Sequence, residues 1–143
     1  MKLTHLSLIV CGITAIAAIA AAQQASKAIV VNLDSANWSH EKGAPPDTEG
    51  VMLHADPVTG AMELLVRFPA GHVIPPHYHD SNERVIVVEG QLTLRRDAAD
   101  TFLNPGGFAW LPAGEVQRLS CSSKTRCTFY LLWDGKPDSH SVK

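Results

Sequence analysis

Residues 71–90 read GHVIPPHYHDSNERVIVVEG, and this stretch decides the fold. On an extended segment, His77 and His79 are two residues apart, so their side chains point to the same face of a strand. Glu83 follows after a polar break and can bring a carboxylate oxygen to the two imidazoles. Two neutral nitrogens and one anionic oxygen suit one divalent metal ion, with Fe, Mn, Ni, Zn and Cu all open. The alternative is a solvated loop that is rich in histidine.

The spacing within this stretch resembles a known motif. Gly71, five residues, His77-x-His79, three residues, Glu83, six residues and Gly90 match the first motif of the cupin superfamily at every defined position. The resemblance spans about residues 50 to 135 and is especially similar to small single-domain cupins of the bacterial type. It implies an all-β fold, a small antiparallel jelly-roll β-barrel.

The second cupin motif is present with one departure at a ligand position. Gly106, Pro112 and Gly114 match its glycines and proline. Gln117 stands where these proteins usually have a metal-binding histidine, and Cys121 where they usually have asparagine. The resemblance implies that Gln117 binds the metal through its amide oxygen, which favours Fe and Mn over Zn and Cu. Two alternatives stay open: Gln117 hydrogen-bonds water or substrate beside the metal, or it fills the barrel and no metal binds.

Residues 1–22 have the pattern of a secretory signal peptide. Lys2 supplies a positive start, residues 6–20 form an apolar run, and residues 20–22 are alanines that offer a small-x-small cleavage pattern. We expect cleavage after Ala22, a periplasmic or secreted protein, and no stable membrane association after cleavage. A permanent anchor is the alternative, but the run barely reaches the length that crosses a bilayer.

The rest of the chain has the size of one domain. We expect an N-terminal strand and loop in residues 23–50, the barrel in 51–135, and a polar tail in 136–143. Apolar runs between turn signals predict strands at residues 27–33, 51–54, 61–68, 83–89, 91–95, 108–111, 116–121 and 126–133. The runs 83–89 and 91–95 are expected to pair as a hairpin.

Side-chain alternation predicts the walls of the site. If Glu83 and Gln117 face the interior, residues two apart on the same strands face it too. A hairpin that pairs Cys121 with Cys127 extends this face to the last strand. The expected apolar pocket residues are Val85, Val87, Leu119, Phe129 and Leu131, with Trp110 or Phe108 as a further wall. For each aromatic, the alternative is an ordinary core position.

Two cysteines remain after signal cleavage. Cys121 and Cys127 flank a five-residue polar loop, and export places the chain where disulfides persist. We predict a disulfide between them. The alternative is two free thiols that pack as small hydrophobes.

The charge of the chain limits the classes of binding partner. The formal net charge is −2 and no basic patch stands out, so nucleic acid is not an expected partner.

The metal site favours a metal-dependent enzyme acting on a small organic molecule, either a dioxygenase-like oxidoreductase or a Lewis-acid catalyst. The alternative is a non-catalytic cupin module that binds a small ligand or a metal. No separate acid–base pair is visible, so no catalytic residue is assigned. The resemblance also allows a homodimer, because cupins often dimerise through sheet edges.

Overall fold

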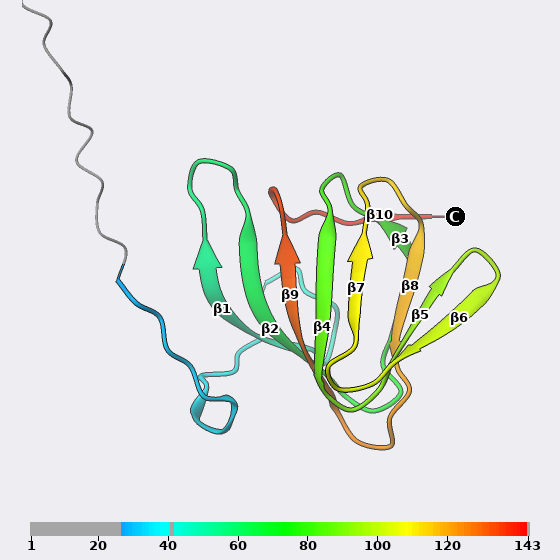
Figure 1. Cartoon of the computed structure of the whole chain (residues 1–143), viewed down its shortest axis with the longest axis horizontal. Coiled ribbons are helices and arrows are strands. Elements are labelled where there is room, and N and C mark those ends of the chain that lie inside the picture. Colours follow the sequence, from blue (N-terminus) through cyan, green and yellow to red (C-terminus); the bar gives the residue numbers. More distant parts are fainter. Residues whose placement is uncertain (1–26, 41, 143) are drawn as a thin grey trace, which may run out of the picture.

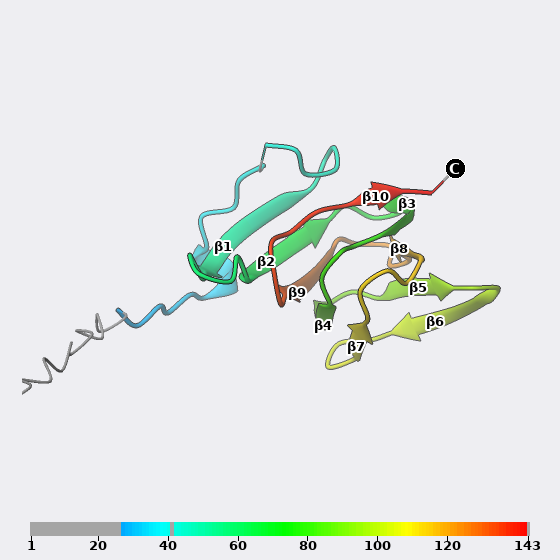
Figure 2. The same ribbon diagram turned by 90° about the horizontal axis from the view of Figure 1, so that it is seen from above.

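The computed structural model describes residues 27–40 and 42–142. Within these residues the chain forms two antiparallel five-stranded sheets that face each other (Figures 1 and 2). The predicted signal peptide lies outside the described residues. Among the described residues, no helix is long and apolar enough to cross a membrane. The all-β prediction is confirmed.

Each sheet mixes strands that are distant in sequence. The first sheet has the spatial order β1 (Glu49–Ala55), β2 (Met62–Phe68), β9 (Cys127–Trp133), β4 (Glu83–Glu89) and β7 (Phe108–Leu111). The second has the order β10 (His140–Ser141), β3 (Val73–Tyr78), β8 (Gln117–Cys121), β5 (Leu92–Arg96) and β6 (Ala99–Leu103). A short 3-10 helix (Leu33–Ser35) precedes them. The chain therefore crosses repeatedly from one sheet to the other, as in a jelly roll.

The two sheets bury a single apolar core between their inner faces. Alternating residues of β4 and β9 supply its centre, and the register sets Val85 opposite Leu131 and Val87 opposite Phe129. The Phe129 ring packs edge-on against the Phe68 ring of β2, with the centroids 4.8 Å apart. This alternation follows from the two-residue period of a strand with one buried face.

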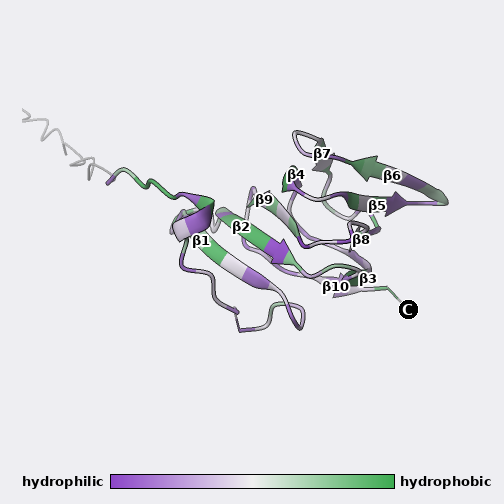
Figure 3. Cartoon of the chain, turned by 90° about the horizontal axis from the view of Figure 1, so that it is seen from below, coloured by the Kyte–Doolittle hydropathy of each residue, from purple (hydrophilic) through white to green (hydrophobic). Residues whose placement is uncertain are grey.

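The outer faces of the edge strands β6 and β7 carry exposed aromatic residues. Phe102 on β6 and Phe108 on β7 are largely solvent-accessible, and Figure 3 shows the hydrophobic colouring of β6. These residues lie outside the barrel core and do not line its interior.

The predicted hairpin between residues 83–89 and 91–95 is wrong. β4 belongs to one sheet and β5 to the other, and the chain passes between the sheets at Gly90. Gly90 has a φ of +75°, and a Cβ at this position would lie 2.7 Å from the Arg126 carbonyl oxygen. Only glycine combines this left-handed backbone with so close an approach. The backbone conformation and this close approach therefore explain why the last residue of the first motif is a glycine.

The predicted strand at residues 27–33 is also wrong. Residues 27–32 have no regular secondary structure, and the side chains of Ile29 and Val30 are exposed. The run has the composition of a strand, but an apolar segment becomes a strand only where a neighbour supplies the hydrogen-bond ladder.

A disulfide joins Cys121, the last residue of β8, to Cys127, the first residue of β9. The predicted bridge is present, but its context differs from the expected hairpin. β8 and β9 lie in different sheets, so the bridge links the two sheets. Phe129 and Leu131 still face the interior, because β9 presents them to the core from the opposite sheet.

Candidate metal site

Four polar side chains are buried together at the end of the barrel where β4 and β8 begin. His77 lies in β3 and His79 follows that strand, while Glu83 begins β4 and Gln117 begins β8. Their exposed fractions are 6%, 7%, 5% and 3%, respectively. Burying polar groups this deeply is costly unless they are paired or bind a metal. The cluster spans both sheets because β3 and β8 belong to one sheet and β4 to the other.

Direct contacts join these four residues. The Gln117 Nε2 donates a hydrogen bond to the Glu83 Oε2, and the His79 Nε2 lies 3.3 Å from the same oxygen. The His77 and His79 ring centroids are 4.9 Å apart, and the register of β3 and β8 sets His77 opposite Gln117. The structure thus brings together all four residues that the sequence proposed as ligands.

The two imidazoles are both held through Nδ1. The His77 Nδ1 donates to the Pro75 carbonyl at 2.7 Å, and the His79 Nδ1 donates to the Asp138 carbonyl at 2.5 Å. A carbonyl oxygen can only accept, so Nδ1 carries the proton in each ring, and the Nε2 of a neutral ring has a free lone pair. Metal-binding histidines have this arrangement, with one nitrogen fixed by a neighbour and the other available to the ion.

The Gln117 Oε1 is buried without a hydrogen-bond partner, and the His79 Nε2 has no hydrogen bond but lies 3.3 Å from the Glu83 Oε2. Both offer a lone pair, and both lie in the cluster that holds the Glu83 carboxylate. A buried acceptor without a partner costs about 1–3 kcal/mol. A divalent cation would take up both lone pairs and balance the carboxylate charge, so the donor types present suit a metal ion.

The electrostatic surroundings of the two histidines differ. Burial lowers the pKa of His77, against a smaller opposing effect of the Pro75 carbonyl. Burial also acts to lower the pKa of His79, but its contacts with Glu83 and Asp138 outweigh burial and raise that pKa. His77 therefore favours the neutral form, while the Glu83 charge draws a proton or a cation to His79.

Most of the residues expected in an apolar pocket are buried, as members of the core between the two sheets. Five predicted pocket residues are buried on the inner faces of the sheets: Val85, Val87, Leu119, Phe129 and Leu131. Trp110 is a correction, because it is 50% exposed on the outer face of β7. The register pairs Leu111 with Glu83, so Leu111 faces inward and its neighbour Trp110 faces outward.

Residues 64–133 match the family model of the cupin domain. A solved structure described as a "putative acetylacetone dioxygenase" from Methylibium petroleiphilum superposes with a TM-score of 0.67 and 20% identity, covering 82% of this chain and 83% of that chain. The fold is the cupin fold. The polyketide cyclase RemF from Streptomyces resistomycificus has the same cupin fold, with a TM-score of 0.65, 19% identity, and coverage of 82% of this chain and 87% of that chain. At these identities the likeness concerns the fold alone.

One curated relative carries a similar sequence. The DNA damage-repair/toleration protein DRT102 of Arabidopsis thaliana is 33% identical over 78 residues, which are 52% of this chain. The chain spans only 24% of the length of that relative. The similarity therefore concerns one segment of a larger protein.

Trp133 lies beside the buried cluster, and the sequence interpretation missed it. Its ring centroid lies 5.8 Å from that of His79, and the register of β9 and β4 sets it opposite Glu83. Its Nε1–H is buried without a hydrogen-bond partner, so it is a free donor beside the site. The signal was available, because Trp133 continues the inward alternation of Phe129 and Leu131.

A second group of potential ligands lies at the surface next to the buried cluster. One ligand atom from each of Asp80, Asp138 and His140 lies within 4.8 Å of the others. The His140 Nε2 is 3.1 Å from the Asp80 Oδ2 and 3.5 Å from the Asp138 Oδ2. Asp80 is exposed and the other two are half-buried. These three residues could hold a metal ion, and a protonated His140 would equally form ion pairs with both carboxylates.

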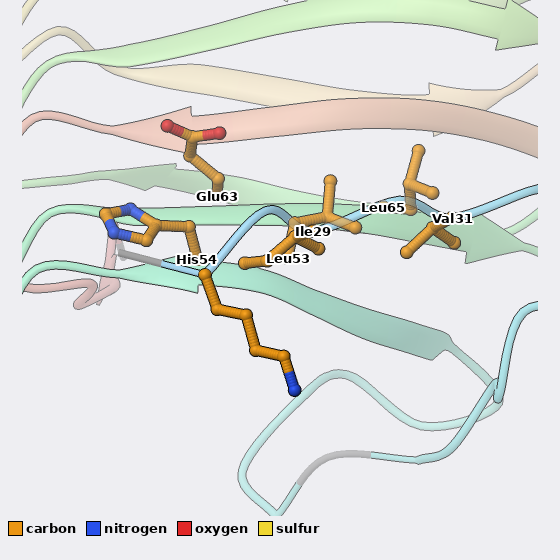
Figure 4. A pocket seen from close by; sticks show the side chains of 7 residues that line it. Ile29, Val31, Leu53, His54, Glu63 and Leu65 are labelled. Carbon is orange, nitrogen blue, oxygen red and sulfur yellow. The ribbon is translucent and has the colours of Figure 1, made fainter. Parts of the chain in front are cut away.

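A surface pocket of about 360 Å³ lies away from both groups. Figure 4 shows it between the N-terminal segment, with Ile29 and Val31, and strands β1 and β2, with Leu53 and Leu65. None of the predicted site residues lines this pocket, so it adds nothing to the chemistry of the buried cluster.

Proposed function

We propose that this chain is an exported metal-binding protein with a cupin barrel. His77, His79 and Glu83 hold one divalent metal ion, with Gln117 as a fourth ligand. The observation that supports this most directly is the buried Gln117 Oε1, which has no hydrogen-bond partner, together with the His79 Nε2, which lies against the buried Glu83 carboxylate. Export is supported by the signal pattern of residues 1–22 and by the disulfide, which persists in oxidising compartments.

We further propose that the protein is a metal-dependent enzyme acting on a small organic molecule. A divalent metal in this site supplies Lewis-acid polarisation or, as Fe(II), activation of dioxygen. The apolar inner faces of β4, β8 and β9 exclude water from the ligands, and the free Trp133 Nε1–H can orient a substrate oxygen. The names of the two structural neighbours, a cyclase and a dioxygenase candidate, agree with a small organic substrate.

Metal content tests the site itself. Mature protein purified without added metal should contain about one metal ion per chain by elemental analysis, as a single mononuclear site requires. The variant Asp80→Ala should retain that metal, because Asp80 is exposed and belongs to the surface group. Loss of the metal on Asp80→Ala would instead assign the ion to Asp80, Asp138 and His140.

Oxygen consumption tests the chemistry. With acetylacetone as a first probe substrate, protein loaded with Fe(II) should consume oxygen at least about tenfold faster than the metal-free protein, a barrier difference of about 1.4 kcal/mol. An oxygen electrode makes the measurement, and free Fe(II) at the same concentration is the control. Retained binding of small organic molecules without metal-dependent turnover of any of them would favour the non-catalytic binding module.

A further inference from the structure

The segment after β9 closes over the site from the C-terminal side. Figure 1 shows it running across the end of the barrel to β10, beside β3. Backbone hydrogen bonds attach it at both ends: the Asp134 N–H donates to the Asn82 carbonyl, and the Val142 N–H donates to the Pro76 carbonyl, each at 3.1 Å. The segment that the sequence suggested as a polar tail is therefore hydrogen-bonded to the part of the chain that carries the first motif.

Asp138 makes the central contacts of this segment. Its backbone carbonyl accepts the His79 Nδ1–H, across 59 positions of sequence. Its side-chain Oδ1 accepts the Asp80 backbone N–H at 3.0 Å and also lies 3.7 Å from the His79 Nδ1. One residue thus holds both the ring of a proposed ligand and the backbone of the next residue, and the side-chain bond sets where the carbonyl lies.

We propose that Asp138 is a positioning residue for the metal site. The inference rests on the proposed function, because it concerns how His79 presents its Nε2 to the ion. The Asp138 carbonyl fixes the tautomer and the orientation of the ring, while the Asp138 carboxylate fixes the carbonyl by holding Asp80. Neighbours that orient a ligand in this way typically change metal affinity by about 10–100-fold when they are lost.

Cobalt binding to three variants of the mature protein tests the proposal. Titration calorimetry with Co²⁺ should show about 10–100-fold weaker binding for Asp138→Ala. Asp138→Asn keeps an oxygen that accepts the Asp80 N–H, so its affinity should stay within about threefold of the wild type. Asp80→Ala is the matched control, because it removes a side chain of the surface group and leaves the backbone N–H in place.

The visible absorption of bound Co²⁺ separates positioning from general stability. The spectrum of Asp138→Ala should differ from that of the wild type, since the spectrum depends on ligand geometry, while thermal unfolding of the metal-free variants shows whether the fold is intact. Wild-type affinity and spectrum in Asp138→Ala would overturn the proposal, and so would equal losses in the Asn and Ala variants. An equal loss in Asp80→Ala would overturn it too, by placing the ion in the surface group. If wild-type protein binds no Co²⁺, the proposed function fails instead.

Discussion

A double variant with His77→Ala and His79→Ala is expected to purify with less than about one-tenth of the metal content of the wild type. The substitutions remove both nitrogen donors and leave one carboxylate and one neutral amide, which is too weak a donor set for a first-row ion. Elemental analysis of both proteins, prepared in parallel without added metal, makes the comparison.

Two controls make this result specific. Circular dichroism should show the same β-sheet content in the double variant, because the core of β4, β8 and β9 is untouched. The single variant His79→Gln keeps most of the side-chain volume and serves if the double variant does not fold. Equal metal content in wild type and folded variants would show that His77 and His79 do not bind the ion.

Replacing Phe129 with alanine should lower the free energy of unfolding by about 3–5 kcal/mol. Phe129 is 1% exposed, lies between the two sheets and packs edge-on against Phe68. Its removal leaves a cavity that the surrounding strands can close only in part, since two hydrogen-bonded sheets and a disulfide hold the walls apart. Chemical denaturation under oxidising conditions measures the change.

Phe102→Ala is the matched control for this prediction. Phe102 is also an aromatic strand residue, but it is 60% exposed on the edge strand β6. Its replacement should change stability by about 0.5 kcal/mol or less, as for most surface positions. Similar losses in the two variants would contradict the assignment of Phe129 to the centre of the core.

The grouping of the proposed ligands could be predicted because its geometry is mostly local. His77 and His79 share a face through the strand period alone, and Glu83 follows within reach at the start of the next strand. Gln117 was proposed as a ligand because of its position in the second cupin motif, and β8 does place it beside Glu83. The inward residues of β4 and β9 followed from alternation once one residue of each strand was assigned to the interior.

The errors concern strand pairing. The run at 91–95 was expected to pair with its neighbour in sequence, but β5 pairs with β6 and β8 in the opposite sheet. Trp110 was expected in the pocket but faces outward, because the side of β7 that faces the core is set by its register with β4. Neither register nor sheet membership is contained in a local pattern, since a slip of one residue reverses every side chain.

By itself, the sequence determined the all-β architecture, the identity of the proposed ligands and the two cysteines that form the bridge. These depend on residue type, on spacing along one strand, and on which cysteines lie outside the expected signal peptide. Only the tertiary structure decided that the bridge joins two sheets, that Trp133 borders the site, and that Asp138 holds His79. These contacts join segments up to 59 positions apart, and they form because each sheet can bury its apolar face only against the other.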